Sequence, residues 1–214
     1  MNMRCFVGLD LSPRNKLDLE HWRSVALPGL TSPIPTRTEP GRGTKSSRTT
    51  ASPSPASTPV PVPAANFHLT LAFLGTVDAR QHEALISALE TIQLPPIALC
   101  LNTTGWWAGP KIVFCAPTQV PDSLSELVRQ VKKAARSAGI QTDQRPYQPH
   151  VTLVRKAGPE LPPPLLAPQL DCRFTRFHLF ESFSTASGVT YPIRHSWPLR
   201  ETLSVRERLR RGLE

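Results

Sequence analysis

The spacing of hydrophobic residues along the chain predicts alternating strands and helices. Ser12 directly before Pro13 is typical of a helix start, and Gly139 ends a long stretch whose apolar residues recur at helical spacing. Short apolar runs bounded by turn residues indicate strands. The expected helices cover 13–25, 79–92 and 121–138, and the expected strands cover 4–11, 68–74, 97–103, 111–116, 148–156, 173–184 and 189–199.

The order strand, helix, strand occurs about twice along this series. It predicts an α+β fold with two pseudo-symmetric lobes, formed by a single domain over residues 1–200. The run over 28–63 is rich in Pro, Ser and Thr and cannot bury enough apolar surface to order itself, so we expect a disordered insert there. Residues 201–214 are expected to form a basic tail.

One short motif occurs in both predicted lobes. Residues 67–71 (FHLTL) and 149–153 (PHVTL) each place a histidine two residues before a threonine in an apolar run. Because residues i and i+2 of a strand share a face, His68 would project with Thr70, and His150 with Thr152. Each strand would then offer one imidazole beside one hydroxyl.

Two such pairs suit acid–base attack on a phosphate. One imidazole takes a proton from water while the other gives a proton to the leaving oxygen, and an ordinary imidazole pKa of about 6.5 allows one neutral and one cationic ring. The threonine hydroxyls would donate to the phosphate oxygens where charge accumulates. A single His-x-Thr motif is common by chance, so the hypothesis rests on the pair.

Four blocks of the chain resemble the two-histidine phosphoesterases, and within them the LigT-like RNA 2′,3′-cyclic phosphodiesterases once described as RNA 2′-5′ ligases. The blocks are residues 4–11 (RCFVGLDL), 66–75 (NFHLTLAFLG), 145–155 (RPYQPHVTLVR) and 177–182 (FHLFES). The resemblance implies two lobes, each an antiparallel sheet with outer helices, around a central cleft. It also implies hydrolysis of a terminal 2′,3′-cyclic phosphate to a 2′-phosphate without metal or cofactor, with His68 as proton donor and His150 as proton acceptor.

Other residues near the motifs are candidates for holding substrate. Arg155 matches the arginine of the family's second motif and would bind phosphate oxygens, but it lies an odd number of residues after Thr152, so a β-bulge or the end of the strand would have to turn it inward. Candidates for contact with the nucleotide or the RNA are Phe73, Lys111, Arg145 and Tyr147. Trp106 and Trp107 lie near a predicted turn, where packing is the expected role.

The composition of the chain indicates which class of substrate and which cellular compartment to expect. The chain of 214 residues has 25 Lys and Arg against 16 Asp and Glu, a formal net charge of +9 that favours a polyanion such as RNA. Its four dispersed cysteines form no metal or redox motif, and no window is apolar enough for a membrane span. We therefore expect a cytoplasmic monomer that acts on RNA with a 2′,3′-cyclic phosphate end, such as tRNA halves or nucleotides.

Two other functions are compatible with the sequence. A relative of the same class could act on another phosphodiester, for example as a 2′-5′ RNA ligase. A non-catalytic RNA-binding module could use the same basic residues, although binding alone needs no matched acid and base.

Overall fold

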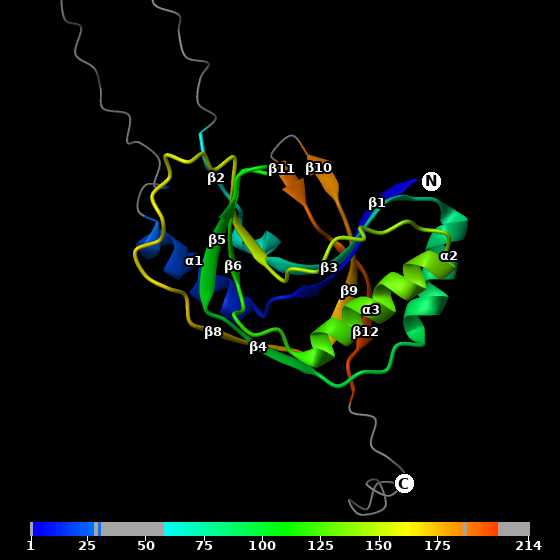
Figure 1. The fold of residues 1–214 in the computed structure, drawn as a ribbon. Coiled ribbons are helices and arrows are strands. Elements are labelled where there is room, and N and C mark those ends of the chain that lie inside the picture. The colour runs from blue at the N-terminus through cyan, green and yellow to red at the C-terminus, as the bar shows by residue number, and fades with distance from the viewer. Residues whose placement is uncertain (1, 28–29, 31–57, 186–187, 201–214) are drawn as a thin grey trace, which may run out of the picture.

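The computed structural model describes residues 2–27, 30, 58–185 and 188–200 (Figure 1). Most of the insert expected over 28–63, and the whole tail expected over 201–214, lie outside the described residues. None of the helices in the described part is long and apolar enough to span a membrane.

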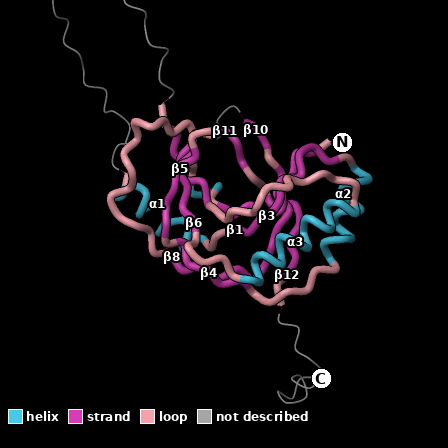
Figure 2. The backbone as a smooth tube through the Cα atoms, in the orientation of Figure 1, coloured by secondary structure: helices cyan, strands magenta, loops and turns pink. Residues whose placement is uncertain are grey.

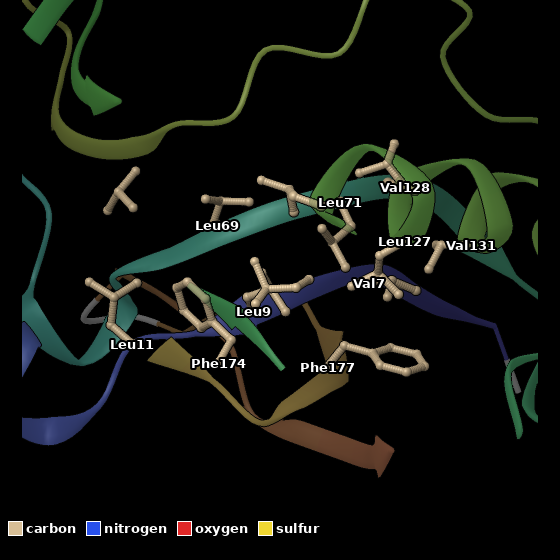
Figure 3. Close-up of a cluster of buried hydrophobic side chains, with 14 of the residues drawn as sticks. Val7, Leu9, Leu11, Leu69, Leu71, Leu127, Val128, Val131, Phe174 and Phe177 are labelled. Carbon is tan, nitrogen blue, oxygen red and sulfur yellow. The ribbon is translucent and has the colours of Figure 1, made fainter. Parts of the chain in front are cut away.

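The first lobe is an antiparallel sheet in the order β12-β9-β1-β3. Its strands are β1 (Met3–Asp10), β3 (His68–Val77), β9 (Arg176–Glu181) and β12 (Ile193–Pro198). Helix α3 (Asp122–Ser137) packs on one face, where its Leu127 and Val128 lie near Val7 and Leu71 (Figure 3), and α2 (Ala79–Glu90) packs beside α3. The other face is left for polar and aromatic side chains.

The second lobe contains a sheet in the order β2-β7-β6-β5 and a separate pair of strands, β4 and β8. Its strands are β2 (Val60–Pro61), β5 (Thr103–Trp107), β6 (Ile112–Ala116) and β7 (Val151–Arg155), with β4 (Ile97–Leu101) and β8 (Leu170–Phe174) as the pair. Helix α1 (Pro13–Ala26) contacts β8 and the short 3-10 turn η2 (Ala64–Asn66). Figure 2 shows α1 on one side of the molecule and α2 with α3 on the other, with the strands between them.

Local sequence signals account for the helix starts. The Ser12 hydroxyl accepts a hydrogen bond from the Asn15 amide at 3.1 Å, and Pro13 occupies the first helical turn, as expected. At α2, Asp78 and Gln81 form a capping box. Helices α1 and α2 therefore begin directly after Ser12 and Asp78, the residues whose side chains cap them.

The structure divides two of the expected strands. The run over 173–184 becomes the end of β8, then β9 and β10 (Phe183–Thr185), because β8 pairs with β4 whereas β9 pairs with β1. The run over 189–199 becomes β11 (Gly188–Thr190) and β12, separated by Pro192, which has no amide hydrogen to donate. β10 and β11 form a small hairpin (Figure 1). Trp107 lies inside β5, a strand that the sequence did not predict.

Candidate active site

Both motif strands carry a β-bulge immediately after the threonine. In β3, Thr70 pairs with Gly8 and the next paired residue is Ala72, so Leu71 is extra. In β7, Thr152 pairs with Phe114 and the next paired residue is Val154, so Leu153 is extra. Each bulge shifts the alternation of faces by one residue.

The bulges place the residue three positions after each threonine on the threonine's face. Leu71 and Leu153 are buried, whereas Phe73 and Arg155 are exposed. Of the two alternatives expected before Arg155, the structure has both: a bulge at Leu153 and the end of β7 at Arg155 itself. The two strands are equivalent here, except that one presents an aromatic ring and the other a guanidinium.

The two imidazoles are held in the same way. Nδ1 of His68 lies 2.7 Å from the carbonyl oxygen of Asn66, and Nδ1 of His150 lies 2.9 Å from that of Gln148. Because a carbonyl only accepts, each Nδ1 carries the hydrogen. In both residues Nε2 is thus the nitrogen that can give or take a proton.

Aromatic rings line each imidazole. The His68 ring centroid lies 4.7 Å from that of Phe6 and 4.9 Å from that of Tyr191. The His150 ring meets Trp107 edge-on at 4.6 Å and lies 5.7 Å from Phe114. These contacts restrict the orientation of both imidazoles and remove water from one side of each.

Gly105 leaves space for the Phe114 ring, one of the aromatic rings beside His150. Gly105 in β5 pairs with Phe114, and a Cβ added at Gly105 would lie 2.4 Å from the Phe114 ring. Any larger residue would push Phe114 away from His150 and Trp107. The packing of Phe114 and Trp107 around His150 therefore depends on Gly105.

The two motifs lie close together although they belong to different lobes. β3 contacts β7, and the Tyr147 hydroxyl donates a hydrogen bond to the Thr70 carbonyl oxygen at 3.1 Å. Arg155, at the end of β7, donates to the Tyr191 hydroxyl at 3.1 Å. His68 thus has residues of both lobes around it.

The surroundings of the two imidazoles lower the pKa of both. Burial lowers the pKa of His68 from 6.5 to about 4, and its hydrogen bond to Asn66 opposes this only in part. Positive charges lower it further, namely Arg155, His150 and Lys16. Burial also lowers the pKa of His150.

A buried arginine connects the backbone of the two motif regions. Arg23 of α1 donates hydrogen bonds to the carbonyl oxygens of Val62 and Leu153, the second at 3.0 Å. Its guanidinium lies 5.2 Å from the ring centroid of Phe67, the residue before His68. Arg23 therefore supports both the bulge after Thr152 and the entry to the first motif.

The remaining candidate residues lie at different distances from this centre. Phe73 is 62% exposed, with its ring 6.2 Å from that of Phe6. Tyr147 is partly buried against the core. Arg145 is exposed and forms an ion pair with Asp143, and Lys111 is exposed in the turn between β5 and β6 with a left-handed φ of 53°.

Three side chains that contact the imidazoles or their strands are not among the candidate residues that the sequence indicates. The packing expected of Trp107 is found, but its partner is His150 itself, and Tyr191 and Arg23 belong to no motif. Adjacent tryptophans were a usable signal for the first. For Tyr191 and Arg23 the sequence offers no motif, because their partners lie far away along the chain.

The side chains around the two imidazoles suit an anion more than a metal. In the part of the chain that the structure describes, no three His, Cys, Asp or Glu side chains converge as metal ligands. The site instead brings together two imidazoles whose Nε2 atoms can give or take a proton and the Arg155 guanidinium, whose N–H groups can donate to an anion.

Comparison with known proteins identifies the family. The model of the LigT-like phosphoesterase family matches residues 54–114 and 113–191. An RNA 2′,3′-cyclic phosphodiesterase of Escherichia coli (strain K12) is 28% identical over 200 residues, which cover 92% of this chain and 97% of that protein.

Solved structures agree with this assignment. E. coli LigT complexed with 3′-AMP matches with a TM-score of 0.74 and 27% identity, covering 94% of this chain and 100% of that chain. E. coli LigT complexed with phosphate matches with a TM-score of 0.70 and 26% identity, covering 94% of this chain and 99% of that chain. The chain belongs to the LigT-like phosphoesterases of the two-histidine superfamily.

Proposed function

We propose that this chain hydrolyses a 2′,3′-cyclic phosphate at the end of an RNA and leaves a 2′-phosphate. The observation that carries the proposal is the matched pair of imidazoles, one from each lobe, each with Nδ1 held by a backbone carbonyl and Nε2 available. The E. coli relative named RNA 2′,3′-cyclic phosphodiesterase supports the substrate class.

In the proposed reaction His150 takes a proton from water, whose oxygen forms a bond to phosphorus. The bond from phosphorus to the 3′-oxygen breaks, and His68 gives its proton to that oxygen. Atoms balance: the product carries a 2′-phosphate and a free 3′-hydroxyl. Water attacks phosphorus on the side opposite the departing 3′-oxygen. The proton acceptor and the proton donor are therefore needed on opposite sides of the phosphate, which explains why the two imidazoles come from different lobes. The assignment of donor and acceptor follows the family resemblance.

Other side chains would bind the substrate. Thr70, Thr152 and Arg155 are proposed to donate to the non-bridging phosphate oxygens, where negative charge grows in the transition state. Exposed Phe73 offers a ring on which a base can stack. Candidates for contacts along the nucleotide or RNA are Tyr147, Arg145 and Lys111.

The proposed partner is an RNA end, such as that of a tRNA half, and the proposed state is a monomer in the cytoplasm. The formal net charge of +9 supports a polyanionic substrate. All four cysteines are free thiols, and Cys5, Cys115 and Cys172 are buried, which suits a reducing compartment.

Removing a threonine hydroxyl should slow the reaction. We expect Thr70→Val and Thr152→Val each to lower kcat/KM by about ten- to a thousandfold, because each variant keeps the shape of the side chain but loses one donor to the transition state. Thr76→Val, at an exposed position further along β3, is the matched control and should keep wild-type activity. Unchanged kinetics for both site variants would refute the proposed role.

The pH dependence should be displaced toward acid. Catalysis needs one proton shared by the two imidazoles, and the pKa values of His68 and His150 both lie below the ordinary 6.5. The state in which one of the two imidazoles is protonated is therefore populated mainly below pH 6.5 and is lost as the pH rises. Two imidazoles with ordinary pKa values would populate it closer to neutral pH. We expect kcat/KM to peak below pH 6.5 and to fall about tenfold per pH unit on the alkaline side. A constant kcat/KM from pH 6 to 8 would contradict this.

The proposal is tested by incubating the protein, in EDTA, with a short RNA that ends in a 2′,3′-cyclic phosphate. A 2′-phosphate product is expected, and the chelator should not slow its formation. A 3′-phosphate product would reverse the assigned direction. Binding without turnover would favour an RNA-binding module, and turnover only of a 2′-5′ linkage would favour another reaction of the superfamily.

A further inference from the structure

Tyr191, an aromatic residue outside the two sequence motifs, contacts residues of both lobes at the candidate site. Tyr191 follows the β10–β11 hairpin, and its ring meets the His68 ring edge-on, with centroids 4.9 Å apart and an interplanar angle of 70°. The same ring lies 5.3 Å from that of Phe6. Tyr191 is therefore packed against the imidazole of the first lobe.

The hydroxyl of Tyr191 contacts the other lobe. Nη2 of Arg155 donates a hydrogen bond to this oxygen at 3.1 Å. Arg155 stands at the exposed end of β7, and Lys156 after it adopts a left-handed φ of 54°. A long side chain at such a position has many rotamers, so a fixed acceptor decides where its guanidinium lies.

The segment that carries Tyr191 is itself anchored at the first motif. The side-chain amide of Asn66 donates to the Val189 carbonyl oxygen at 2.7 Å, and the Asn66 carbonyl oxygen contacts Nδ1 of His68. One residue thus orients the imidazole and holds the chain two residues before Tyr191. The hydrogen bond to Arg155 therefore starts from a fixed point of the first lobe.

We propose that Tyr191 is a positioning residue that holds the Arg155 guanidinium beside His68, where it can bind the phosphate. The inference rests on the proposed function, since it assigns Arg155 to the phosphate of that reaction. A pre-placed guanidinium needs no ordering when substrate binds, so the interaction contributes to the transition state in full. The hydrogen bond also joins the lobes that carry the two imidazoles.

A double-mutant cycle tests the inference. Tyr191→Phe keeps the ring against His68 and removes the acceptor, and Arg155→Met removes the guanidinium but keeps much of the side-chain length. We expect Tyr191→Phe alone to lower kcat/KM for a 2′,3′-cyclic phosphate about tenfold, and to have no further effect in Arg155→Met. No loss in Tyr191→Phe, or an equal loss in both backgrounds, would overturn the inference.

A second readout does not depend on turnover. The charges acting on His68 come from β7 (Arg155), the segment before it (His150) and α1 (Lys16), which is paired with Asp10. If Tyr191→Phe releases Arg155, the His68 pKa measured by NMR titration rises, and it does not rise further when Arg155→Met is added. An unchanged His68 pKa in Tyr191→Phe would contradict the positioning role.

The control variant is Thr190→Val, which removes from the same hairpin a hydroxyl that donates to the Phe183 carbonyl oxygen at 3.5 Å. It should leave both kcat/KM and the His68 pKa at the wild-type values. If the wild-type protein fails to hydrolyse the cyclic phosphate, the proposed function is wrong, and the NMR titration still decides whether Tyr191 holds Arg155.

Discussion

Replacing either His68 or His150 by alanine is expected to lower kcat by about a thousandfold or more. Each imidazole supplies one of two proton transfers, and each transfer typically contributes about a hundred- to ten-thousandfold. Because the two transfers belong to one reaction, the double variant should be little worse than either single variant. Single-turnover kinetics on an RNA with a 2′,3′-cyclic phosphate end measures this.

The matched control for this prediction is His178→Ala. His178 lies on β9 of the same sheet and bonds to the Ser196 hydroxyl at 2.8 Å, but it belongs to neither motif. It should retain activity, and all three variants should keep the circular dichroism spectrum of the wild type. Full activity in either motif variant would exclude a mechanism that uses two imidazoles.

The second large effect is expected on stability, from Arg23→Ala. The side chain is buried, and the variant would leave the Val62 carbonyl oxygen without the guanidinium donor while also removing the packing on Phe67. Loss of hydrogen bonds from a charged donor to buried acceptors costs about 3 kcal/mol in the free energy of unfolding. Urea denaturation at constant pH measures the change.

Arg14→Ala on the same helix provides the comparison. The Arg14 side chain is 92% exposed and forms a solvent-exposed ion pair with Asp18, so its replacement should change the free energy of unfolding by less than about 0.5 kcal/mol. If Arg23→Ala proves as mild as Arg14→Ala, Arg23 does not hold the two motif regions together.

The sequence predicted most of the fold because its signals are local. The helix starting after Ser12 and the apolar face of α3 depend on neighbouring residues, and both agree with the structure. The divided strands could not be predicted in the same way. Whether the chain around Thr175 continues one sheet or crosses to another depends on the partners β4 and β1, which are distant in sequence.

The same distinction applies to the site. The repeated motif predicted that each histidine shares a face with its threonine, and Leu69 and Val151 between them are buried. The strand expected over 148–156 is shorter than predicted, however, since β7 begins at Val151, one residue after His150. The odd spacing between Thr152 and Arg155 indicated a bulge or the end of the strand, and a bulge is present at Leu153. Side chains that act between lobes, such as Tyr191 and Arg23, have no local pattern and become visible only when the chain is folded.

If one imidazole from each lobe acts on a single phosphate, a crystal structure with a nucleoside 2′-phosphate bound should show both rings at that phosphate. We expect Nε2 of His68 and Nε2 of His150 each to lie within about 2.6–3.2 Å of oxygens of the same phosphate, on opposite sides of phosphorus. A phosphate contacted by only one imidazole, or bound outside the space between His68 and His150, would exclude the two-imidazole mechanism.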